Sequence, residues 1–431
     1  MRFIADLHLH SRFAYACSKT LSIEELTKWG MFKGITLLAT GDFTHPLWFD
    51  ELQNDLIPIG NGLFRPKDEI IESVKKVVPK SCHREVYFML ECEVSCIYSK
   101  NDRVRKVHHL IYAPDFETVR EINSQLAKIG NLTSDGRPIL GIDSGELLKI
   151  VLQSSDSAYL VPAHAWTPHF AIFGSNSGFD SLEECFGDLT EHIFAIETGL
   201  SSDPEMNRLW SKLDTITLIS GSDSHSARRI GREANIFDTD LTYDGVWSAI
   251  KENDRSKFIG TFEFFPHEGR YHYDGHRNCK ILYHPTESAD HNNLCPTCGK
   301  PLTLGVLHRV MALSDRTTAE NVESYQNLIP LDEAIAEVKN VKGVQSKAVQ
   351  QAYFALIDEL GPELEILSSI PIDAIAAAGG RLLAEAIKRI RSGSVSIKPG
   401  YDGLYGEIHI FTPHEREKLE RIGQPQQPSL F

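Results

Sequence analysis

The sequence predicts an α/β fold: a barrel of alternating strands and helices, then a small zinc-binding module and a mostly helical C-terminal region. Three observations predict it. Short apolar runs alternate with amphipathic stretches over residues 1–265, a segment rich in His, Cys and Asn covers residues 266–305, and helical periodicity dominates residues 306–420. A chain of 431 residues, 42% of them hydrophobic, is long enough to bury the cores of two or three such domains.

Apolar runs define the strands of the first region. They read RFIADLHLH, GITLLATGD, VYFMLECEVS, VHHLIYAP, AYLVPAHA, HIFAIETG, TITLISGSDSH and KFIGTFEFF. Helix-like stretches such as LSIEELTKWGMFKG, DFETVREINSQLAKIG, DPEMNRLWSKLD and YDGVWSAIKEN lie between them. This alternation implies a mainly parallel sheet, and seven or eight units in succession favour a barrel over an open sheet.

Polar residues gather at one end of these runs. Those at or near a C-terminal end are His8, His10, Asp42, Glu93, His108, His164, Glu197, Asp223 and His225. Active sites of parallel barrels are built at that end. A single histidine is more often structural, but imidazoles and carboxylates at so many corresponding strand ends predict one shared pocket.

The residue types in this set predict metal binding. His8 and His10 are two residues apart, so a strand end presents both on one face, and Asp223 and His225 repeat that spacing. Imidazole with carboxylate suits Zn, Mn or Fe, and bridging carboxylates allow several ions in one pocket. Adjacent divalent ions generate hydroxide and neutralise charge on a phosphoester during in-line attack. We therefore expect metal-assisted phosphoester hydrolysis, with Glu93, Asp223 and His225 in the catalytic centre.

The motifs HLHS, ECEVS, VHHL, PAHA and GSDSH, in that order and spacing, resemble the PHP (polymerase and histidinol phosphatase) superfamily of metal-dependent phosphoesterases. The resemblance covers about residues 1–265 and implies a distorted (β/α)7 barrel with up to three metal ions. The ligands that it implies are His8, His10, Glu93, His108, His164, Asp223 and His225.

Two departures from the superfamily pattern concern the metal positions. The family usually shows TDH after the second strand, but this chain reads ATGDFTHP, with Phe43 where the histidine is expected. Either Asp42 or His45 serves as the ligand instead, or that position is altered. The stretch RFAYACSK after HLHS also lacks the usual Asp or His, which leaves the third metal position open.

The segment HRNCKILYHPTESADHNNLCPTCGK contains two further ligand pairs. His276 with Cys279 and Cys295 with Cys298 are separated by 15 residues, which matches zinc-ribbon spacing. His284 competes with His276 for the fourth place. Four protein ligands close a site, so we expect a structural zinc that stabilises a segment with no core of its own. A reduced cysteine pair without metal is the alternative.

Basic and aromatic residues predict the DNA-binding surfaces. HSARRIGR directly follows the Asp223/His225 pair, and its arginines are candidates to hold a phosphate backbone, with Arg229 also a catalytic candidate. The glycines and tyrosines of PGYDGLYG favour close approach to a ligand and base stacking. The predicted DNA-binding residues are Arg228, Arg229, Arg232, Arg389, Lys398, Tyr401 and Tyr405. Solvated charged faces and an ordinary hairpin are the alternatives.

The downstream motifs narrow the resemblance. A PHP barrel followed by CPTCGKPLTLGVLHR, helices and PGYDGLYG resembles the endonuclease Q family over nearly the whole chain. The resemblance implies a Mg- or Mn-dependent endonuclease that nicks double- or single-stranded DNA on the 5′ side of deaminated bases (uracil, hypoxanthine, xanthine) and abasic sites, leaving 3′-hydroxyl and 5′-phosphate ends. A small-molecule phosphatase, such as one acting on histidinol phosphate, and a non-catalytic DNA-binding module are the alternatives.

The ends and the composition bear on partners and location. Gln427, Leu430 and Phe431, in a predicted disordered tail of residues 421–431, resemble the Q-x-x-L-F peptide that docks on the bacterial sliding clamp. No run of 18 apolar residues occurs and the start lacks an apolar signal stretch, so we expect a cytoplasmic protein with no membrane partner. The net charge of −15 argues against a surface coated with phosphate-binding residues, although it allows a local basic groove.

Overall fold

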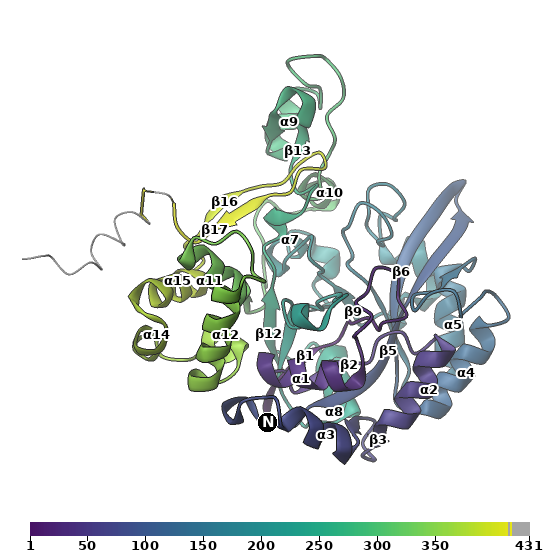
Figure 1. Ribbon diagram of the computed structural model, residues 1–431. Helices are drawn as coiled ribbons and strands as arrows, with labels where there is room; N and C mark the ends of the chain where they lie inside the picture. Colours follow the sequence, from purple (N-terminus) through teal and green to yellow (C-terminus); the bar gives the residue numbers. More distant parts are fainter. Residues whose placement is uncertain (413, 416–431) are drawn as a thin grey trace, which may run out of the picture.

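The computed structural model describes residues 1–412, 414 and 415, and the predicted clamp-binding tail of residues 421–431 lies outside them. The described chain forms a mixed α/β body, a small module that projects from it, and a block of helices beside it (Figure 1). None of the described helices is long and apolar enough to cross a membrane.

A central sheet organises the body. Its strands are β1 (Arg2–Asp6), β2 (Leu37–Ala39), β3 (Leu56–Pro58), β4 (Phe64–Pro66), β5 (Tyr87–Lys100), β6 (Arg103–Ala113), β7 (Ile139–Leu140), β8 (Tyr159–Pro162), β11 (Ala234–Asp238), β12 (Phe258–Glu263) and β15 (Tyr325–Asn327). The main path runs β15–β12–β11–β1–β2–β5–β4–β3, while β6 pairs with both β5 and β8. The predicted helical C-terminal region therefore contributes a strand, β15, to the sheet of the first region.

The sheet is mixed, which corrects the expectation of a mainly parallel one. β1, β2 and β5 are parallel neighbours, but β6 runs antiparallel to β5 and β8, and β11 runs antiparallel to β1 and β12. The residues between VYFMLECEVS and VHHLIYAP extend both strands into one long hairpin instead of forming a helix. Its turn residues, Asn101 and Asp102, have φ of 55° and 56°, the left-handed backbone that a tight hairpin turn requires.

The short strands β9 (Ala195–Glu197) and β10 (Thr217–Ile219) form a separate parallel pair. Backbone hydrogen bonds just beyond the strand ends join this pair to the others. The Ala165 N–H, after β8, donates to the Glu197 carbonyl, and the His10 N–H, after β1, donates to the Ser224 carbonyl. The C-terminal ends of β1, β8, β9 and β10 therefore meet, and the polar residues there are brought together.

Helices pack around the outside of the sheet (Figure 1). They are α1 (Ile23–Lys33), α2 (Pro46–Asp55), α3 (Asp68–Lys75), α4 (Phe116–Leu126), α5 (Ser144–Ser154), α6 (Leu182–Phe186), α7 (Pro204–Asn207) and α8 (Tyr243–Lys251), with 3-10 turns η1 (Lys80–Cys82), η2 (Gly187–His192), η3 (Ser211–Leu213) and η4 (Ala227–Arg229). The stretch DPEMNRLWSKLD forms only α7 and η3 rather than one helix. The buried Arg208 guanidinium binds the Ile216 carbonyl and Glu323, which turns the chain back on itself.

The inner face of the sheet is packed rather than hollow. Leu7, Met89, Leu110 and Tyr112 belong to one buried cluster that includes Trp247 of α8. A second, larger cluster lies between the sheet and the outer helices. Successive side chains of a strand point alternately to these two cores. The position of a polar residue along its strand therefore decides which face of the sheet its side chain takes. His108 and His109 illustrate this, because His109 turns outward and its Nε2 lies 2.8 Å from the Ser144 hydroxyl.

The last third of the chain builds the projecting module and the helical block. The module contains η5 (Pro266–Glu268), β13 (Asp274–His276), η6 (Arg277–Cys279), β14 (Ile281–Tyr283) and α9 (Pro285–Asp290), with α10 (Val306–Leu313) and the antiparallel pair β16 (Ser396–Lys398) and β17 (Glu407–His409) at its base. The block contains α11 (Leu331–Lys339), α12 (Lys347–Leu360), α13 (Glu363–Ser368), α14 (Ile372–Gly379) and α15 (Arg381–Arg391). A buried ion pair of 2.7 Å between Lys33 and Glu363 links this block to α1.

Candidate metal centre

Two groups of ligand-type side chains meet where the strands end. His8, His10, Glu93 and Asp223 form one group, and Glu93, His108 and His164 form the other. Within each group the ligand atoms all lie within 4.8 Å of one another. Six of the predicted metal-binding residues are therefore brought together from elements spread over more than 200 residues of sequence.

Glu93 belongs to both groups because its two oxygens face different sets of histidines. Its Oε1 lies 2.6 Å from His108 Nδ1 and 3.0 Å from His164 Nε2. Its Oε2 lies 3.4 Å from His10 Nε2. Burial by itself raises the pKa of Glu93, but the neighbouring histidines hold it well below its usual range. The carboxylate is thus charged and oriented as a bridge between two sites.

The donor set fits divalent metal ions. His8 is fully buried, yet its Nε2 has no hydrogen-bond partner in the part of the chain that the structure describes, and it lies 3.7 Å from Asp223 Oδ1 and 3.9 Å from Glu93 Oε2. These separations are too long for hydrogen bonds, but they suit ligands arranged around one ion. An unpartnered buried imidazole is costly, and a bound cation would give this nitrogen the partner that the described protein atoms do not.

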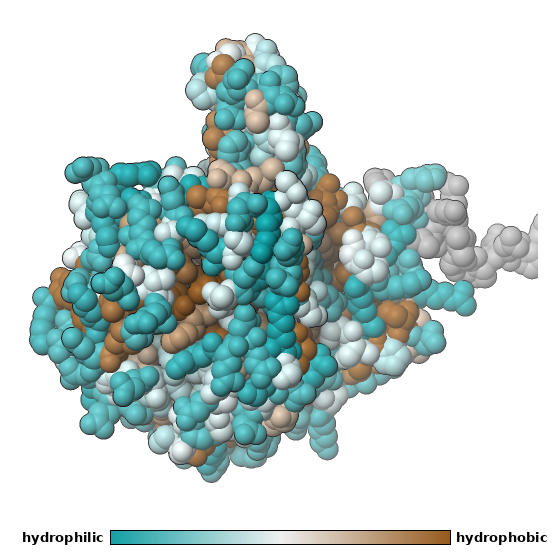
Figure 2. All heavy atoms as spheres, turned by 180° about the vertical axis from the view of Figure 1, so that it is seen from behind, coloured by the Kyte–Doolittle hydropathy of each residue, from teal (hydrophilic) through white to brown (hydrophobic). Residues whose placement is uncertain are grey.

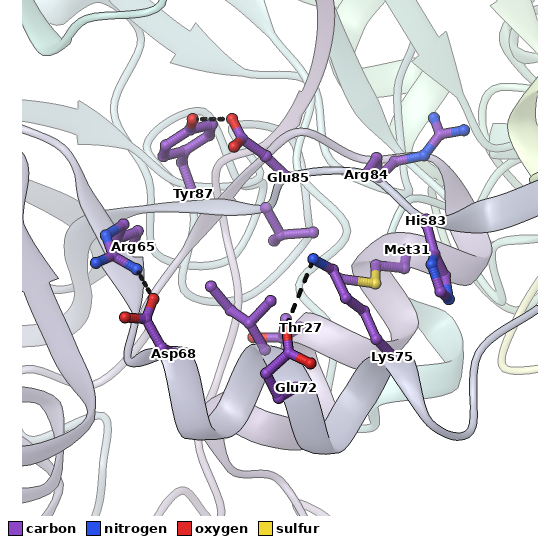
Figure 3. Close-up of a pocket in the computed structure, with 12 residues that line it drawn as sticks. Thr27, Met31, Arg65, Asp68, Glu72, Lys75, His83, Arg84, Glu85 and Tyr87 are labelled. Carbon is purple, nitrogen blue, oxygen red and sulfur yellow. Dashed lines mark hydrogen bonds and ion pairs between the residues drawn. The ribbon is translucent and has the colours of Figure 1, made fainter. Parts of the chain in front are cut away.

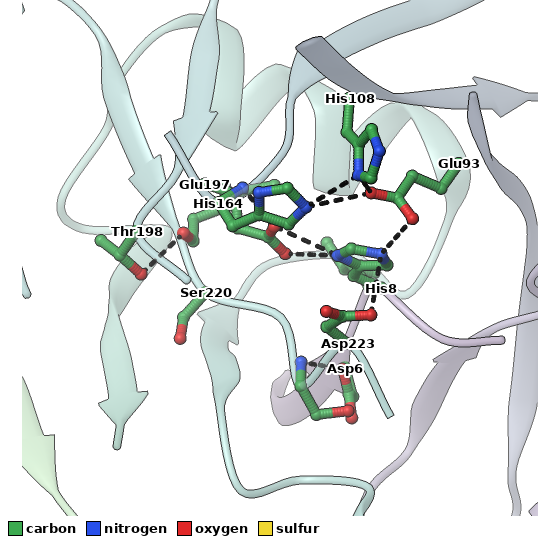
Figure 4. A network of polar contacts seen from close by, with 12 residues as sticks. Asp6, His8, Glu93, His108, His164, Glu197, Thr198, Ser220 and Asp223 are labelled. Carbon is green, nitrogen blue, oxygen red and sulfur yellow. Dashed lines mark hydrogen bonds and ion pairs between the residues drawn. The ribbon is translucent and has the colours of Figure 1, made fainter. Parts of the chain in front are cut away.

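Glu197, at the end of β9, holds two of the histidines in place (Figure 4). Its Oε1 lies 2.9 Å from His8 Nδ1, and its Oε2 accepts a hydrogen bond of 2.8 Å from the His164 backbone N–H. Burial by itself lowers the pKa of His8, but the Glu197 carboxylate outweighs it and raises the pKa to about 10. Metal binding at Nε2 must therefore displace a proton.

Asp42 lies behind His10 and not in either ligand group. Its Oδ1 accepts from His10 Nδ1 at 3.0 Å, while its Oδ2 accepts from the Ser11 backbone N–H and hydroxyl, both at 2.6 Å. Phe43, which replaces the family histidine, is fully buried. The geometry therefore indicates that Asp42 orients the His10 ring, whereas the sequence predicted Asp42 as a possible metal ligand.

His45 is also outside both groups. It is the residue that precedes α2, its ring stacks on Phe13 at 4.4 Å between centroids, and burial lowers its pKa. The expectation that Asp42 or His45 replaces the family histidine as a ligand is thus not supported by the positions of these side chains.

Replacing Asp42 by asparagine tests its orienting part. An amide of the same shape places an N–H group against either His10 or Ser11, which frees the imidazole to rotate or to change tautomer. We expect metal affinity to fall by about 10- to 100-fold, with activity restored by excess metal. Isothermal titration with Mn or Zn measures this, and an unchanged affinity would contradict the orienting part.

His225 stands beside the first group but outside it. Its side chain is 34% exposed, its ring centroid lies 4.7 Å from that of His10, and its Nδ1 lies 3.0 Å from the Asp223 carbonyl. To bind a metal ion, His225 would have to use Nε2 or rotate its ring slightly. His225 therefore faces the mouth of the site, where a substrate would enter.

The three arginines after Asp223 are already engaged. Arg228 donates 3.0 Å to Asp332 and 2.8 Å to Gln350, and its guanidinium stacks on Trp29 and Tyr353. These contacts connect η4 to α11 and α12, so Arg228 anchors the helical block. Local sequence could not show this, because its partners lie more than 100 residues away.

Arg229 and Arg232 are more accessible. Arg229 is 36% exposed and pairs with Glu333 at 2.5 Å, and Arg232 is half-buried with its Nε bound to the Ser222 carbonyl at 2.9 Å. A DNA phosphate would have to compete with Glu333 for Arg229.

The backbone at the site is locally strained. Asp42, His164, Phe170 and Asp223 have φ of 48°, 30°, 60° and 46°, a left-handed region that side-chain-bearing residues seldom adopt. Such strain persists where the surrounding structure holds a functional group in a required direction. Phe170 is the residue of this set that sequence reasoning missed, and its ring packs 4.8 Å from that of His108.

A buried carboxyl, Glu263, supports the site from behind (Figure 4 labels its neighbours Thr198 and Ser220). It accepts hydrogen bonds of 3.0 Å from Thr198, 3.2 Å from Ser220 and 2.5 Å from Thr261. Burial, with the Asp203 carboxylate nearby, raises its pKa to about 8.

The raised pKa of Glu263 predicts a pH-dependent stability. The unfolded side chain loses its proton near 4.5, but the folded one keeps it to about 8. The folded state therefore binds one more proton in that window, and the free energy of unfolding falls as the pH rises through it, by at most about 1.4 kcal/mol per pH unit. Thermal melts from pH 5 to pH 8 should show a flatter decline for Glu263→Gln than for the unchanged protein, and equal slopes would contradict the assignment.

The projecting module holds the second predicted cluster. His276, Cys279, Cys295 and Cys298 offer ligand atoms within 4.8 Å of one another, and His276 Nδ1 lies 3.6 Å from Cys298 Sγ. Burial by itself raises the pKa of Cys295, but the N–H groups of Cys298 and Thr297 lower it to about 6, which favours the thiolate. Figure 2 shows the module from behind as a narrow projection with hydrophobic residues at its base.

His284, the alternative candidate for the fourth zinc ligand, has a structural role instead. It precedes α9, where its Nδ1 accepts from the Thr286 N–H and its own N–H donates 2.9 Å to Glu287, a reciprocal cap of the helix. The fourth position of the cluster is therefore occupied by His276.

The remaining DNA-binding candidates divide into exposed and internal residues. Tyr405 is 72% exposed with the Arg270 guanidinium 5.1 Å from its ring, and Lys398 is 66% exposed beside Glu407. Tyr401 is half-buried and bridges to Tyr273 of the module. Arg389 is internal, since it bonds Glu385, Glu415 and the Ile410 carbonyl. Arg389 therefore stabilises the helical block.

A cavity of about 520 Å³ lies on another part of the surface, between α1, α3 and the start of β5 (Figure 3). Arg65, Asp68, Glu72, Lys75 and Tyr87 are among its lining residues. Glu93 lies further along β5 than Tyr87, and none of the metal-ligand residues lines this cavity, so it is separate from the metal centre.

Comparisons with known proteins place this geometry in context. Residues 330–394 match the family model described as the MJ0043 C-terminal domain. The chain is 32% identical over 276 residues to the uncharacterised protein MJ0043 of Methanocaldococcus jannaschii, covering 61% of the chain but only about a third (34%) of that protein. It is 27% identical over 419 residues to the uncharacterised protein YqxK of Bacillus subtilis, covering 94% of the chain and 99% of that protein.

Solved structures give matches over nearly the whole chain. The lesion-specific endonuclease PfuEndoQ from Pyrococcus furiosus matches with a TM-score of 0.82 and 31% identity, covering 97% of both chains. Endonuclease Q in complex with a 27-mer duplex substrate, with an abasic lesion at the active site, matches with a TM-score of 0.80 and 31% identity, covering 96% of this chain and 98% of that one.

Proposed function

The chain belongs to the endonuclease Q family, and we propose that it hydrolyses the DNA phosphodiester on the 5′ side of a lesion. The proposed lesions are uracil, hypoxanthine, xanthine and abasic sites, and the products carry 3′-hydroxyl and 5′-phosphate ends. The observation that carries the proposal is Glu93, shared by two buried ligand groups at the strand ends. Ring closure of β1, β2, β5, β6, β8, β9 and β10 into the distorted barrel is part of the same proposal.

Metal ions would be held by the two groups described above. We assign one ion to His8, His10, Glu93 and Asp223 and a second to Glu93, His108 and His164, with zinc as a resident ion and Mg or Mn supporting activity. Such ions generate hydroxide and neutralise charge on a phosphodiester when bound. His225 belongs to the site as a residue at its mouth.

The chain's own residues orient and move protons. Asp42 and Glu197 orient the rings of His10 and His8. Glu93 links the two ligand groups, because each of its oxygens faces one of them. Asp223 is 27% exposed, so its carboxylate reaches both the ligand group and the mouth and can accept a proton from the attacking water. The 3′-oxygen that leaves takes its proton from solvent water at the mouth of the site, beside His225, whose Nδ1 is held by the Asp223 carbonyl.

DNA would lie between the strand ends and the last third of the chain. We assign residues 1–265 to catalysis, residues 266–305 to a zinc-stabilised module, and residues 306–420 to DNA recognition. The proposed contacts are the exposed Tyr405 and Lys398 and the partly buried Arg229 and Arg232, with phosphate binding by the basic groups and stacking by the tyrosine. A damaged nucleotide must leave the base stack to reach a buried centre.

The tail completes the proposal. Gln427, Leu430 and Phe431 would dock on the bacterial sliding clamp, in keeping with the proposed repair function. This part rests on sequence alone.

Cleavage of a labelled duplex tests the function. The protein is incubated with Mg or Mn and a duplex that carries one deoxyinosine or uracil, beside Asp223→Ala and the matched control Asp156→Ala. Asp156 is exposed at the opposite end of β8 from His164. We expect a nick 5′ to the lesion for the protein and the control, and a rate lowered by about 1,000-fold for Asp223→Ala, the several kcal/mol that a metal ligand supplies.

The same assay separates the alternatives. Phosphate release from small esters without a nick would favour a small-molecule phosphatase, and no reaction on either substrate would favour a non-catalytic module. The near-complete ligand groups and the full-length match support the nuclease over both.

A further inference from the structure

Arg137 touches the metal-ligand cluster, although no sequence pattern singles it out. Its Nη1 donates a hydrogen bond of 3.0 Å to Glu93 Oε2, the same oxygen that faces His10. The side chain is 26% exposed, so the guanidinium is reached both from the ligand group and from the mouth of the site. An arginine on the oxygen that is also a proposed metal ligand places a fixed positive charge beside the metals.

The backbone around Arg137 is held from several sides. The Gly136 N–H donates to the Phe13 carbonyl at 3.1 Å, and the Thr44 hydroxyl donates to the Gly136 carbonyl at 3.1 Å. The Arg137 N–H itself donates 2.9 Å to Asp135. A Cβ atom at Gly136 would lie 2.4 Å from Asp42 Oδ2, so only glycine permits this approach. The guanidinium is therefore pre-positioned against the HLHS and GDFTH segments.

Most of the hydrogen-bonding capacity of Arg137 is unspent. A guanidinium has five N–H donors in a planar fork, and within residues 1–412, 414 and 415 the side chain's one hydrogen bond is the bond to Glu93. Arg228 differs in its surroundings, because its Nε and Nη1 donate to Asp332 and Gln350 and its guanidinium lies over the rings of Trp29 and Tyr353. Partly exposed, rigid and with free donors, Arg137 has the features of an oxyanion-binding arginine.

We propose that Arg137 binds a non-bridging oxygen of the scissile phosphate while it holds Glu93, and so stabilises the charge that develops during hydrolysis. This inference rests on the proposed phosphodiester cleavage. The geometry supports it because Arg137 Nη1 contacts Glu93 Oε2, so a phosphate held by a cation at that oxygen would lie close to the same guanidinium. A fixed donor in a water-poor site is worth most when negative charge grows.

If the role of Arg137 is only structural, different experimental results are expected. If the guanidinium only neutralised Glu93, its loss would lower the metal content or the melting temperature and would leave anion binding at the loaded site unchanged. Arg137→Ala and Arg137→Lys separate the two parts, because lysine keeps the charge but lacks the fork. Arg120→Ala on α4, exposed and bound to Gln53, is the matched control.

The kinetic test uses single-turnover cleavage of a lesion-bearing duplex. We expect Arg137→Ala to lower the cleavage rate by about 100- to 1,000-fold, with metal content by mass spectrometry and melting temperature unchanged and with duplex affinity lowered by no more than about tenfold. Added guanidinium ion should restore part of the rate, and Arg137→Lys should fall between. A rate equal to that of the Arg120→Ala control, or a rate loss that only follows lost metal, would overturn the proposal.

A second arm does not depend on DNA cleavage. Inorganic phosphate is titrated into the metal-loaded protein by calorimetry, and its affinity should fall about tenfold or more in Arg137→Ala, the cost of one charge-assisted hydrogen bond. If the unchanged protein fails to nick any lesion but shows this difference, the nuclease function is wrong and the anion-binding arginine stands. Equal phosphate affinities would overturn the arginine whatever the nuclease result.

Discussion

Glu93→Gln is expected to remove lesion cleavage, with a loss of about 1,000-fold or more, since several kcal/mol of charge stabilisation disappear. The carboxylate offers one oxygen to each ligand group, at 2.6 Å from His108 and 3.4 Å from His10. A glutamine has the same shape but one oxygen, and its NH2 group cannot bind a cation. Whichever way the amide turns, one group loses a ligand and gains a donor that faces an imidazole.

Metal content and cleavage measured together check this result. We expect the Glu93→Gln protein to keep its fold, because the side-chain volume is unchanged, but to bind fewer ions per chain in its first region. Glu121→Gln, the same chemical change on the exposed face of α4, should leave both quantities as they are. A Glu93→Gln protein with full metal content and full activity would show that Glu93 is not the bridge.

The ligand groups could be predicted from sequence because strand ends impose them. His8 and His10 follow β1, His164 follows β8 and Asp223 follows β10, so each residue is placed by a short apolar run that ends beside it. Glu93 is different, since it lies inside the long strand β5. Its inward direction follows from the alternation along β5, a period-two signal that the sequence carries.

The parts that could not be predicted depend on contacts between distant segments. Asp42 turns toward His10 because its backbone is left-handed, which no pattern around ATGDFTHP reveals. Arg228 was expected at the DNA, but Trp29, Asp332 and Tyr353 surround it. Arg137 became a candidate only when the fold brought it to Glu93. The role of a side chain, structural or chemical, cannot be predicted from the local sequence when its partners are remote in the chain.

The direction of β6 is a second feature that the sequence could not predict, because β6 runs antiparallel to β5. An apolar run of suitable length predicts a strand, but not its direction, and the polar stretch between β5 and β6 reads equally as a helix connection or a hairpin. The register of the hairpin nevertheless places Ser95 opposite His108, close to Glu93. Six of the predicted ligand side chains therefore lie close together although the predicted sheet was partly wrong, because the face that a residue takes matters more here than the direction of its strand.

His276→Ala is expected to release the metal of the projecting module and to loosen that module, whereas His284→Ala should not. His276 lies 3.6 Å from Cys298 and completes the four-ligand cluster, while His284 only caps α9. The module has few buried apolar side chains, so a bound metal would supply much of its folding free energy. We expect His276→Ala to lose one zinc per chain and to expose residues 270–305 to protease. Duplex affinity should fall by about tenfold or more, because Tyr405, the proposed DNA contact at the base of the module, would lose support.

His284→Ala is the matched control, because it removes an imidazole from the same module. Its loss should cost about 1 kcal/mol of helix capping and leave zinc content unchanged. Cys295→Ser should behave like His276→Ala, since Cys295 is buried and its thiolate is favoured by two backbone N–H groups. The structural assignment fails if either ligand variant loses cleavage while zinc content, protease resistance and duplex affinity stay intact, because the module would then take part in the chemistry itself.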